Sequence, residues 1–180
     1  MNGRCFVSNK VCVLAKKRGQ KKRGWTEIWR VRVGDEVLTH KGRFRKVIRV
    51  INSPSKEDDV FWRLKTGDTY GGGHIEVNVT KGHRFLIGGK KGEGLKWRKV
   101  ENIRVGEKVA YLKEISTISH EYWDWRLIEG EVIEVEELKK KFKRVYCLEV
   151  EEDHGFIIYE GLVSKNCRHA LQIIGKAREG

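Results

Sequence analysis

The sequence predicts an all-β protein, and three observations support this fold class. Apolar and polar residues alternate over several short stretches, glycines separate these stretches, and a repeat extends over most of the chain. Alternation at a period of two residues is typical of strands with one face on a core. It is clearest in residues 29–33, 44–51 and 75–80.

Turns and loops are expected where glycine breaks the alternation. The glycines in question stand in Gly34-Asp35, Lys41-Gly42, Gly71-Gly72-Gly73, Gly88-Gly89 and Glu160-Gly161. Pro54, the only proline, indicates a loop rather than a domain boundary. Helix is predicted only for residues 134–142 and for the tail after Cys167. Residues 116–129 are predicted to form a loop with some order.

The internal repeat predicts two similar β subdomains. Five positions recur in order 72 residues later: Trp25, Ile28, Val31, Gly34 and Val37 match Trp97, Val100, Ile103, Gly106 and Val109. The register then shifts by 13, so that residues 47–50 match 132–135 and residues 60–61 match 145–146. A further match pairs residues 83–87 with 154–158, with a histidine at the start of each. Two copies packed around a pseudo-two-fold axis are the simplest interpretation.

Length and composition predict a single cytosolic domain. The chain has 180 residues, of which 39% are hydrophobic, so one ordinary core can form. No apolar run is long enough to span a membrane, and the N-terminus lacks the apolar stretch of a secretory signal. The four cysteines form no C-x-x-C pair, and we expect them to be free thiols. Neither a metal nor a cofactor is expected.

The net charge of +13 raises nucleic-acid binding as an alternative class of function. Residues 16–23 form the main basic run, and the segment 122–125 contains two tryptophans that could stack on bases. No zinc-finger, RNP or helix-turn-helix pattern accompanies them, and acidic stretches occur at residues 129–137 and 149–153. A basic β module that binds nucleic acid is therefore a minor alternative.

Nucleophiles stand near both ends of the chain. Cys5 lies close to the N-terminus, and Asn166-Cys167 stands near the C-terminus. An asparagine followed by a thiol, with a second thiol far upstream, suits chemistry on the backbone of the chain itself.

Five segments in order make the chain resemble an intein. They are Cys5-Phe6, residues 33–38, residues 79–85, residues 145–156 and Asn166-Cys167. The resemblance implies a HINT fold, which is a horseshoe of long curved strands, over residues 5–166. Residues 1–4 and 167–180 would then be remnants of a host protein. No LAGLIDADG-like or H-N-H-like run is present, so a mini-intein without a homing endonuclease is implied, and no nucleic acid is required as a partner.

The resemblance also implies a reaction sequence. Cys5 converts the preceding amide to a thioester, with His83 assisting the departing nitrogen and Thr80 orienting that histidine. Cys167 then takes the acyl group by transesterification, and Asn166 cyclises to release the C-terminal segment, with His154 as its helper. The substrate would be the chain's own flanking segments, and we expect a monomer.

Three residues depart from the family pattern. Lys165 stands where a histidine is common, so the cyclisation of Asn166 needs another helper: His154 alone, or Lys165 as a cationic donor, with slow cleavage as the third possibility. Cys147 stands where many relatives have aspartate and could exchange protons with Cys5 or His83. Gly82 replaces a frequent acidic residue.

A Hedgehog-type or bacterial intein-like autocleavage domain is an alternative, although such a domain needs no nucleophile at position 167.

Overall fold

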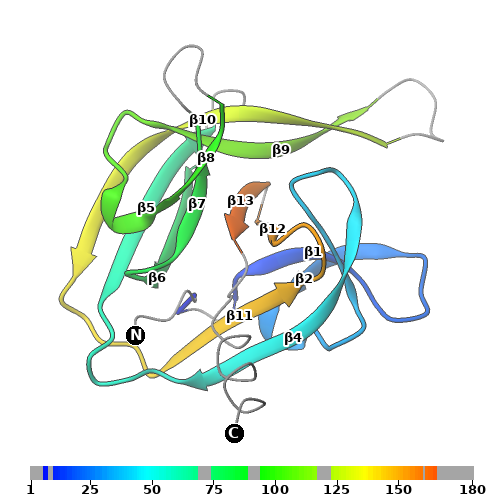
Figure 1. Cartoon of the computed structure of the whole chain (residues 1–180), viewed down its shortest axis with the longest axis horizontal. Coiled ribbons are helices and arrows are strands. Elements are labelled where there is room, and N and C mark those ends of the chain that lie inside the picture. Colours follow the sequence, from blue (N-terminus) through cyan, green and yellow to red (C-terminus); the bar gives the residue numbers. More distant parts are fainter. Residues whose placement is uncertain are drawn as a thin grey trace, which may run out of the picture.

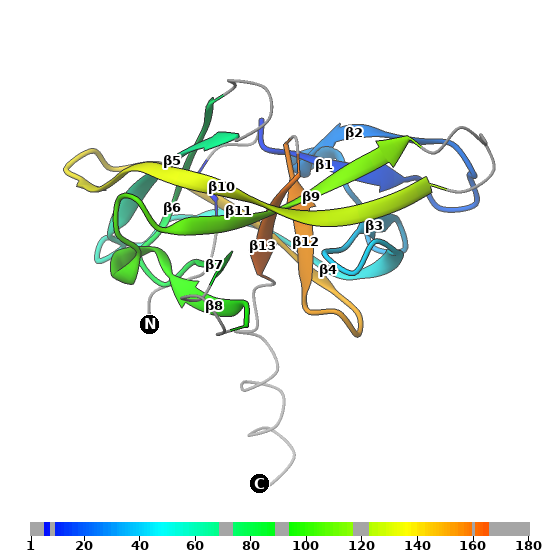
Figure 2. The same cartoon turned by 90° about the horizontal axis from the view of Figure 1, so that it is seen from above.

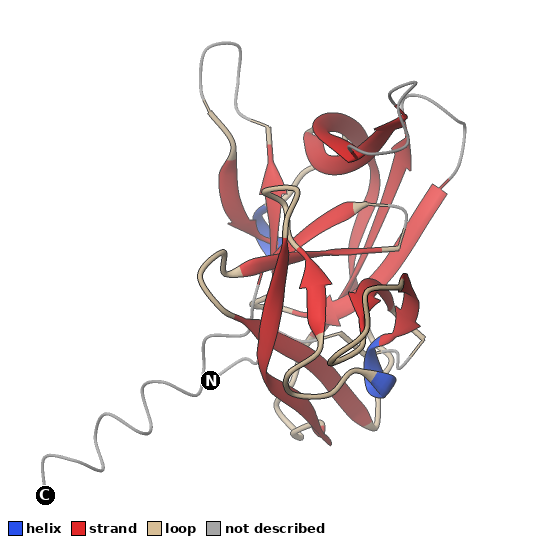
Figure 3. Ribbon diagram, turned by 90° about the vertical axis from the view of Figure 1, so that its right-hand side faces the viewer, coloured by secondary structure: helices blue, strands red, loops and turns tan. Residues whose placement is uncertain are grey.

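The computed structural model describes residues 6–7, 10–68, 74–88, 94–116, 123–159 and 161–165. In this part of the chain nearly all regular structure is antiparallel β, as predicted, with two single-turn 3-10 helices (Figure 3). No helix among these residues is long and apolar enough to cross a membrane.

The strands are short at the N-terminal end and longest in the middle of the chain. They are β1 (Cys12–Lys16), β2 (Arg23–Glu27), β3 (Glu36–Leu38), β4 (Phe44–Pro54), β5 (Phe61–Asp68), β6 (His74–Thr80), β7 (Arg84–Ile87), β8 (Lys96–Lys99), β9 (Lys108–Ser116), β10 (Trp123–Leu138), β11 (Arg144–Val150), β12 (Gly155–Ile158) and β13 (Leu162–Lys165). The 3-10 helices are η1 (Ile28–Arg30) and η2 (Val100–Asn102).

The order of the strands has a pseudo-two-fold axis at its centre. Along the sheet the order is β11-β4-β3-β1-β12-β13-β7-β9-β10-β5-β6, with β2 paired to β1 and β8 paired to β7. Reading outward from β12 and β13, each half presents a corresponding series of strands, and β6 is the one addition. Figure 1 shows the two halves on either side of the β12–β13 hairpin.

Matching hydrogen bonds confirm the repeat seen in the sequence. In the first half Gly34 N donates to Val47 O, and Val47 N donates back to Asp35 O. In the second half Gly106 and Glu107 make the same pair of bonds with Val132. Both glycines have positive φ, +91° and +86°, which side chains disfavour. The same turn is therefore built twice.

Hydrogen bonding also corrects one feature of the predicted repeat. His83 O accepts a hydrogen bond from Val100 N, and the corresponding bond in the first half runs from Ile28 N to Val11 O. The counterpart of His83 is therefore Val11 and not His154. The histidine occurs in one copy only.

The β12–β13 hairpin is buried on both faces. Phe156, Ile158 and Leu162 belong to the main core, whereas Ile157 and Val163 belong to a second cluster with Leu14, Leu38, Leu86, Ala110 and Leu112. Gly161 in the turn has a φ of +123°, and a Cβ there would lie 2.3 Å from Leu112 O. Only glycine fits this close approach.

The two ends of the sheet meet at Phe6. Its backbone exchanges two hydrogen bonds of 2.8 Å with Tyr146 of β11, and it also forms a bridge with Val79 of β6. The next residue, Val7, donates to Asn78 O. Residues 6–7 therefore lie between β11 and β6, the two end strands of the sheet order.

Four predicted elements are wrong. Pro54 is not in a loop, because it ends β4 and pairs with Arg144 of β11. Residues 29–33 are not a strand: η1 and a turn replace it, and Trp29 and Val33 are exposed. Residues 134–142 are not a helix, because β10 continues to Leu138. Residues 116–129 are not simply a loop, since Trp123–Glu129 lie in β10 opposite β9. The β9–β10 hairpin therefore extends across the width of the molecule (Figure 2). The predicted helix after Cys167 lies outside the described residues.

Candidate functional site

His83 is buried at the start of β7. The turn that follows β6 places it there: His83 N donates to Thr80 O at 2.9 Å, and His83 O accepts from Val100 N at 2.8 Å. Its side chain is completely inaccessible to solvent. Because the backbone N–H and C=O of His83 are both hydrogen-bonded, the backbone from which its imidazole projects has a fixed position between β6 and η2.

Phe6, which forms isolated bridges with β11 and β6, packs on this imidazole. The ring centroids of Phe6 and His83 lie 4.5 Å apart, and Phe6 also contacts Phe156 of β12 at 6.2 Å. Phe85, on the same strand as His83, completes the aromatic surroundings at 4.9 Å. The residue that follows Cys5 in the sequence is thus fixed against His83.

The last strand of the chain reaches the same histidine from the other side. Ser164 of β13 is fully buried, and its Oγ lies 2.8 Å from His83 Nε2, within hydrogen-bonding distance. The backbone of Ser164 pairs with Phe85 and with Phe156. One buried imidazole therefore contacts both Phe6 and Ser164, which are 158 residues apart in the sequence.

Thr80 and Cys147 lie on the two edge strands that meet at Phe6. Thr80 ends β6, is 1% exposed and pairs with Phe61 of β5. Cys147 follows Tyr146 on β11, is fully buried and lies in an apolar cluster with Val7, Phe61 and Val145. Its thiol contacts Leu148 O at 3.6 Å. Cys147 and Cys12 are both free thiols.

Lys165 and His154 lie at the end of the central hairpin. Lys165 pairs with Gly155, and its ammonium lies 5.2 Å from the centre of the Trp97 ring. His154 directly precedes Gly155, is exposed and has a φ of +53°. Both residues therefore lie near the point at which the chain continues from Lys165 to Asn166. Cys5, Asn166 and Cys167 lie outside the described residues.

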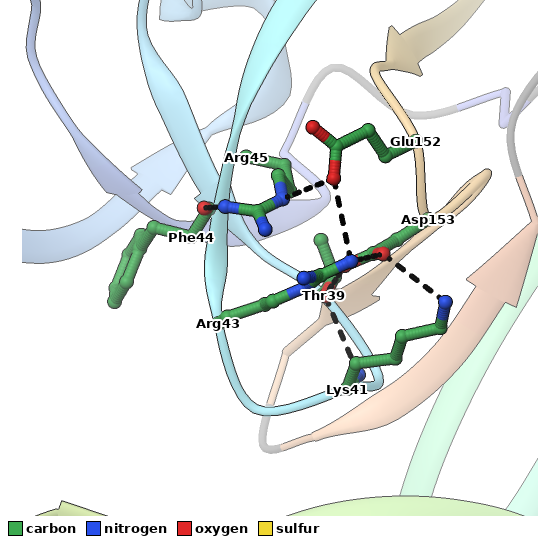
Figure 4. A network of polar contacts seen from close by, with 7 residues as sticks. All are labelled: Thr39, Lys41, Arg43, Phe44, Arg45, Glu152 and Asp153. Carbon is green, nitrogen blue, oxygen red and sulfur yellow. Dashed lines mark hydrogen bonds and ion pairs between the residues drawn. The ribbon is translucent and has the colours of Figure 1, made fainter.

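A buried carboxylate anchors the turn that carries His154. Asp153 accepts hydrogen bonds from Thr39 Oγ1 at 2.6 Å and from Arg43 Nε at 3.0 Å, and Lys41 Nζ lies 3.3 Å away (Figure 4). The hydrogen bonds from Arg43, followed by those from Thr39 and Lys41, hold the pKa of Asp153 well below its usual value although burial opposes them. The β3–β4 loop therefore fixes the start of β12.

Sequence reasoning missed three residues of this site. Phe6 was read only as the neighbour of Cys5, and Asp153 only as part of an acidic stretch. Ser164 carried a weak signal, since it is a polar residue directly after the apolar pair Leu162-Val163. Its contact with His83 depends on strand pairing, which residue spacing does not encode.

Comparisons with known proteins identify the fold. No protein-family model and no curated protein sequence match the chain. Among solved structures, it resembles the Mvu transcription factor IIB mini-intein (17% identity, TM-score 0.64, 90% of this chain and 99% of that one). It also resembles an intein from a hyperthermophile (16% identity, TM-score 0.62, 90% of this chain and 99% of that one). A third similar structure is the DnaX mini-intein from Spirulina platensis (21% identity, TM-score 0.59, 89% of this chain and 98% of that one). The chain therefore has the fold of the inteins.

Proposed function

We propose that this chain excises itself by protein splicing and joins residues 1–4 to residues 167–180. The observation that carries the proposal is the single buried imidazole of His83, which contacts Phe6 on one side and Ser164 on the other. The structural likeness to mini-inteins supports the same reading.

The short sequence separations between the proposed reacting residues and the contacts of His83 support a shared site. Consecutive Cα atoms lie about 3.8 Å apart. Cys5 is one residue from Phe6, and Asn166 is two residues from Ser164. Links this short allow both proposed scissile peptide bonds to approach His83. Cys167 is close enough in the sequence to approach the same place.

The first step makes a thioester at Cys5. The Cys5 Sγ attacks the carbonyl carbon of Arg4, the bond from that carbon to the Cys5 nitrogen breaks, and the nitrogen takes up a proton as an amine. His83 is the proton donor to that nitrogen, and Thr80 orients His83 through the turn that joins them. Cys147, a buried thiol on the strand beside Phe6, exchanges protons with Cys5, so that the Cys5 thiol proton is passed on as its sulfur attacks.

The second step transfers the Arg4 acyl group between sulfurs. Cys167 Sγ attacks the thioester carbonyl as a thiolate, a sulfur–carbon bond forms to Cys167, and Cys5 leaves as a thiolate. Such an exchange is fast when the two sulfurs are held in position. The product is a branched chain with two N-termini.

The third step cuts the C-terminal junction. The side-chain nitrogen of Asn166 attacks its own backbone carbonyl, the bond to Cys167 nitrogen breaks, and a succinimide remains on the intein. His154 donates a proton to the departing amine, and Lys165 helps to place the carbonyl. The freed amine of Cys167 then takes the acyl group from its own sulfur, which leaves an ordinary Arg4–Cys167 peptide bond.

Incubation of the full chain with a thiol reductant tests the proposal by intact-mass measurement. Splicing gives two products: residues 5–166 carrying a C-terminal succinimide, and a peptide of residues 1–4 joined to 167–180. Separate peptides 1–4 and 167–180 without the joined one would favour an autocleavage domain. A chain of unchanged mass would contradict both.

Two variants assign the steps. Cys5→Ala removes the first nucleophile, so the joined peptide should be absent while residues 167–180 are still released. Asn166→Ala should instead accumulate the branched chain, which has the mass of the precursor but two N-termini in sequencing. Joined peptide from either variant would contradict the proposed order.

A further inference from the structure

Lys165 is held by an aromatic contact on the face of β13 opposite His83. Successive residues of a strand point to opposite faces. Ser164 reaches His83, whereas the ammonium of Lys165 lies over the Trp97 ring, 5.2 Å from its centre. The lysine is only 9% exposed. A cation over tryptophan is most stable when water is excluded in this way.

His40 packs on the same tryptophan. Its ring meets Trp97 edge to face, with centroids 5.4 Å apart and an interplanar angle of 84°. Its buried Nδ1 has no hydrogen-bond partner among the residues that the structure describes. An unpartnered buried nitrogen is unfavourable and indicates a site where another group completes the contact.

Gly155 provides the space in which these groups meet. A Cβ on Gly155 would lie 3.0 Å from Trp97 and 3.1 Å from His40 Nδ1. Gly155 is also the strand partner of Lys165. Lys165 therefore meets Trp97 and Gly155, and His40 lies beside both of these residues; Trp97, His40 and Gly155 are here called the Lys165 cradle.

We propose that the Lys165 cradle positions the C-terminal junction for cyclisation of Asn166, so that His40 and Trp97 are positioning residues for that step. This inference rests on the proposed splicing function. Cyclisation requires the Asn166 side-chain nitrogen to approach its own carbonyl in one orientation. With Ser164 fixed on one face of β13 and Lys165 on the other, the chain enters Asn166 in a single direction.

The cradle also makes the step sensitive to pH. Burial holds the pKa of His40 below its ordinary value, and Lys41 acts in the same direction, while the Asp153 carboxylate opposes them. His40 is therefore neutral at neutral pH. As the pH falls through this lowered pKa, below about 6.5, an imidazolium joins the ammonium of Lys165 at the same tryptophan. The two cations repel, so Lys165 is displaced and C-terminal cleavage slows.

The test measures C-terminal cleavage alone, in the full chain carrying Cys5→Ala. Release of residues 167–180 is followed by mass spectrometry from about pH 5 to about pH 8. Trp97→Leu removes the cation contact and should slow the release roughly fivefold at neutral pH. Trp25→Leu is the matched control, because Trp25 occupies the corresponding place in the other half and is 50% exposed. It should leave the rate unchanged.

His40→Phe separates charge from packing. Phenylalanine keeps a ring against Trp97 but cannot be protonated, so this variant should cleave at the parent rate near neutral pH and lose the decline at acidic pH. A purely structural role for His40 predicts a uniform change at every pH. Thermal unfolding of each variant shows whether it is folded at the assay temperature.

Three results would overturn the inference. One is an equal rate for the Trp97→Leu and Trp25→Leu chains, and another is an acidic decline that persists in His40→Phe. The third is a parent chain that releases no 167–180 peptide at any pH, which overturns the splicing proposal and the cradle together. Release at one common rate from all chains overturns the cradle alone.

Discussion

The two halves of the molecule have the same backbone plan and different chemistry. Each half contains a strand, a partner strand, a single 3-10 turn and a glycine turn in the same order. Even the turn carboxylates correspond, since Asp35 accepts from Arg32 N and Glu107 from Arg104 N. Yet the residues directly before the first strand of each half differ: Val11, before β1, takes the place of His83, before β7.

The surroundings of the two tryptophans differ in the same way. Trp97 is partly buried and contacts both His40 and Lys165. Trp25, its counterpart in the repeat, is 50% exposed. The two halves therefore share a backbone scaffold, and the candidate site differs from its counterpart at a few side chains near the pseudo-two-fold axis. Substitution of corresponding residues in the two halves tests whether these side chains act in the reaction or only in the fold.

The largest effect is expected when His83→Ala is compared with Val11→Ala, the same substitution at the corresponding position of the other half. Loss of an acid–base group should slow thioester formation at Cys5 by roughly 10² to 10⁴-fold, measured as reductant-dependent release of residues 1–4. Val11→Ala should leave that rate unchanged and lower the free energy of unfolding by about 2 kcal/mol. If both variants slowed the reaction equally, His83 would have no chemical role.

Asp153→Ala tests a feature that only the first half supplies, the β3–β4 loop that binds this carboxylate. Leaving Arg43 and Thr39 without their buried partner should lower the free energy of unfolding by about 3 kcal/mol, measured in urea. Glu152→Ala, on the exposed neighbour, should cost less than about 0.5 kcal/mol.

The pH dependence of the Asp153 effect has a definite sign. Because its folded pKa lies below the unfolded value near 3.9, its stabilisation is complete above that value and is lost as the pH falls through the folded pKa. The difference between the parent and Asp153→Ala should therefore be constant at neutral pH and shrink only in strong acid. A difference that already shrinks near pH 6 would contradict the assignment.

Ser164→Ala should affect the reaction more than the fold. Without its hydroxyl, His83 loses a partner that lies 2.8 Å away, and thioester formation should slow roughly tenfold through poorer orientation. Ile158 is the corresponding residue of the other central strand, and Ile158→Val should cost about 1 kcal/mol of stability without changing the rate. An unchanged rate in Ser164→Ala would mean that this contact does not orient His83.

The smallest effects are expected at the paired turns. Gly34→Ala and Gly106→Ala each place a Cβ on a residue with positive φ, and each should lower the free energy of unfolding by about 1 kcal/mol. At Gly34 the new Cβ lies 3.2 Å from the flexible Arg18 side chain, whereas the space at Gly106 is open. A cost in one half alone, measured by urea unfolding, would show that the turns are not equivalent.

Much of the fold could be predicted because alternation and repetition are local or periodic signals. The alternation at residues 44–51 and 75–80 lies in β4 and β6 as predicted. The predicted helix at 134–142 is wrong because cross-strand contacts override local preference: Glu134 and Glu136 both pair with Arg63 on β5. The strand predicted at 29–33 is wrong because Asp35 binds the backbone of Arg32 and closes a turn instead.

The candidate site could be predicted only in part, because a motif identifies residues but not their neighbours. Thr80, His83 and Cys147 are all buried around the position of Phe6, where the two edge strands meet. The roles of these three residues stay predictions, as do those of the other predicted site residues: Cys5, His154, Lys165, Asn166 and Cys167. Ser164 and His40 gave almost no signal, since their importance arises from pairing between distant strands.

The position of β13 governs when the candidate site can be completed. Ribosomes synthesise proteins from the N-terminus, so residues 162–165 are made after all the other described strands, yet they occupy the middle of the sheet. Until then the strands of both halves lack the element that joins them, and Ser164 cannot contact His83. The architecture therefore delays completion of the candidate site until the last of the described strands has been made.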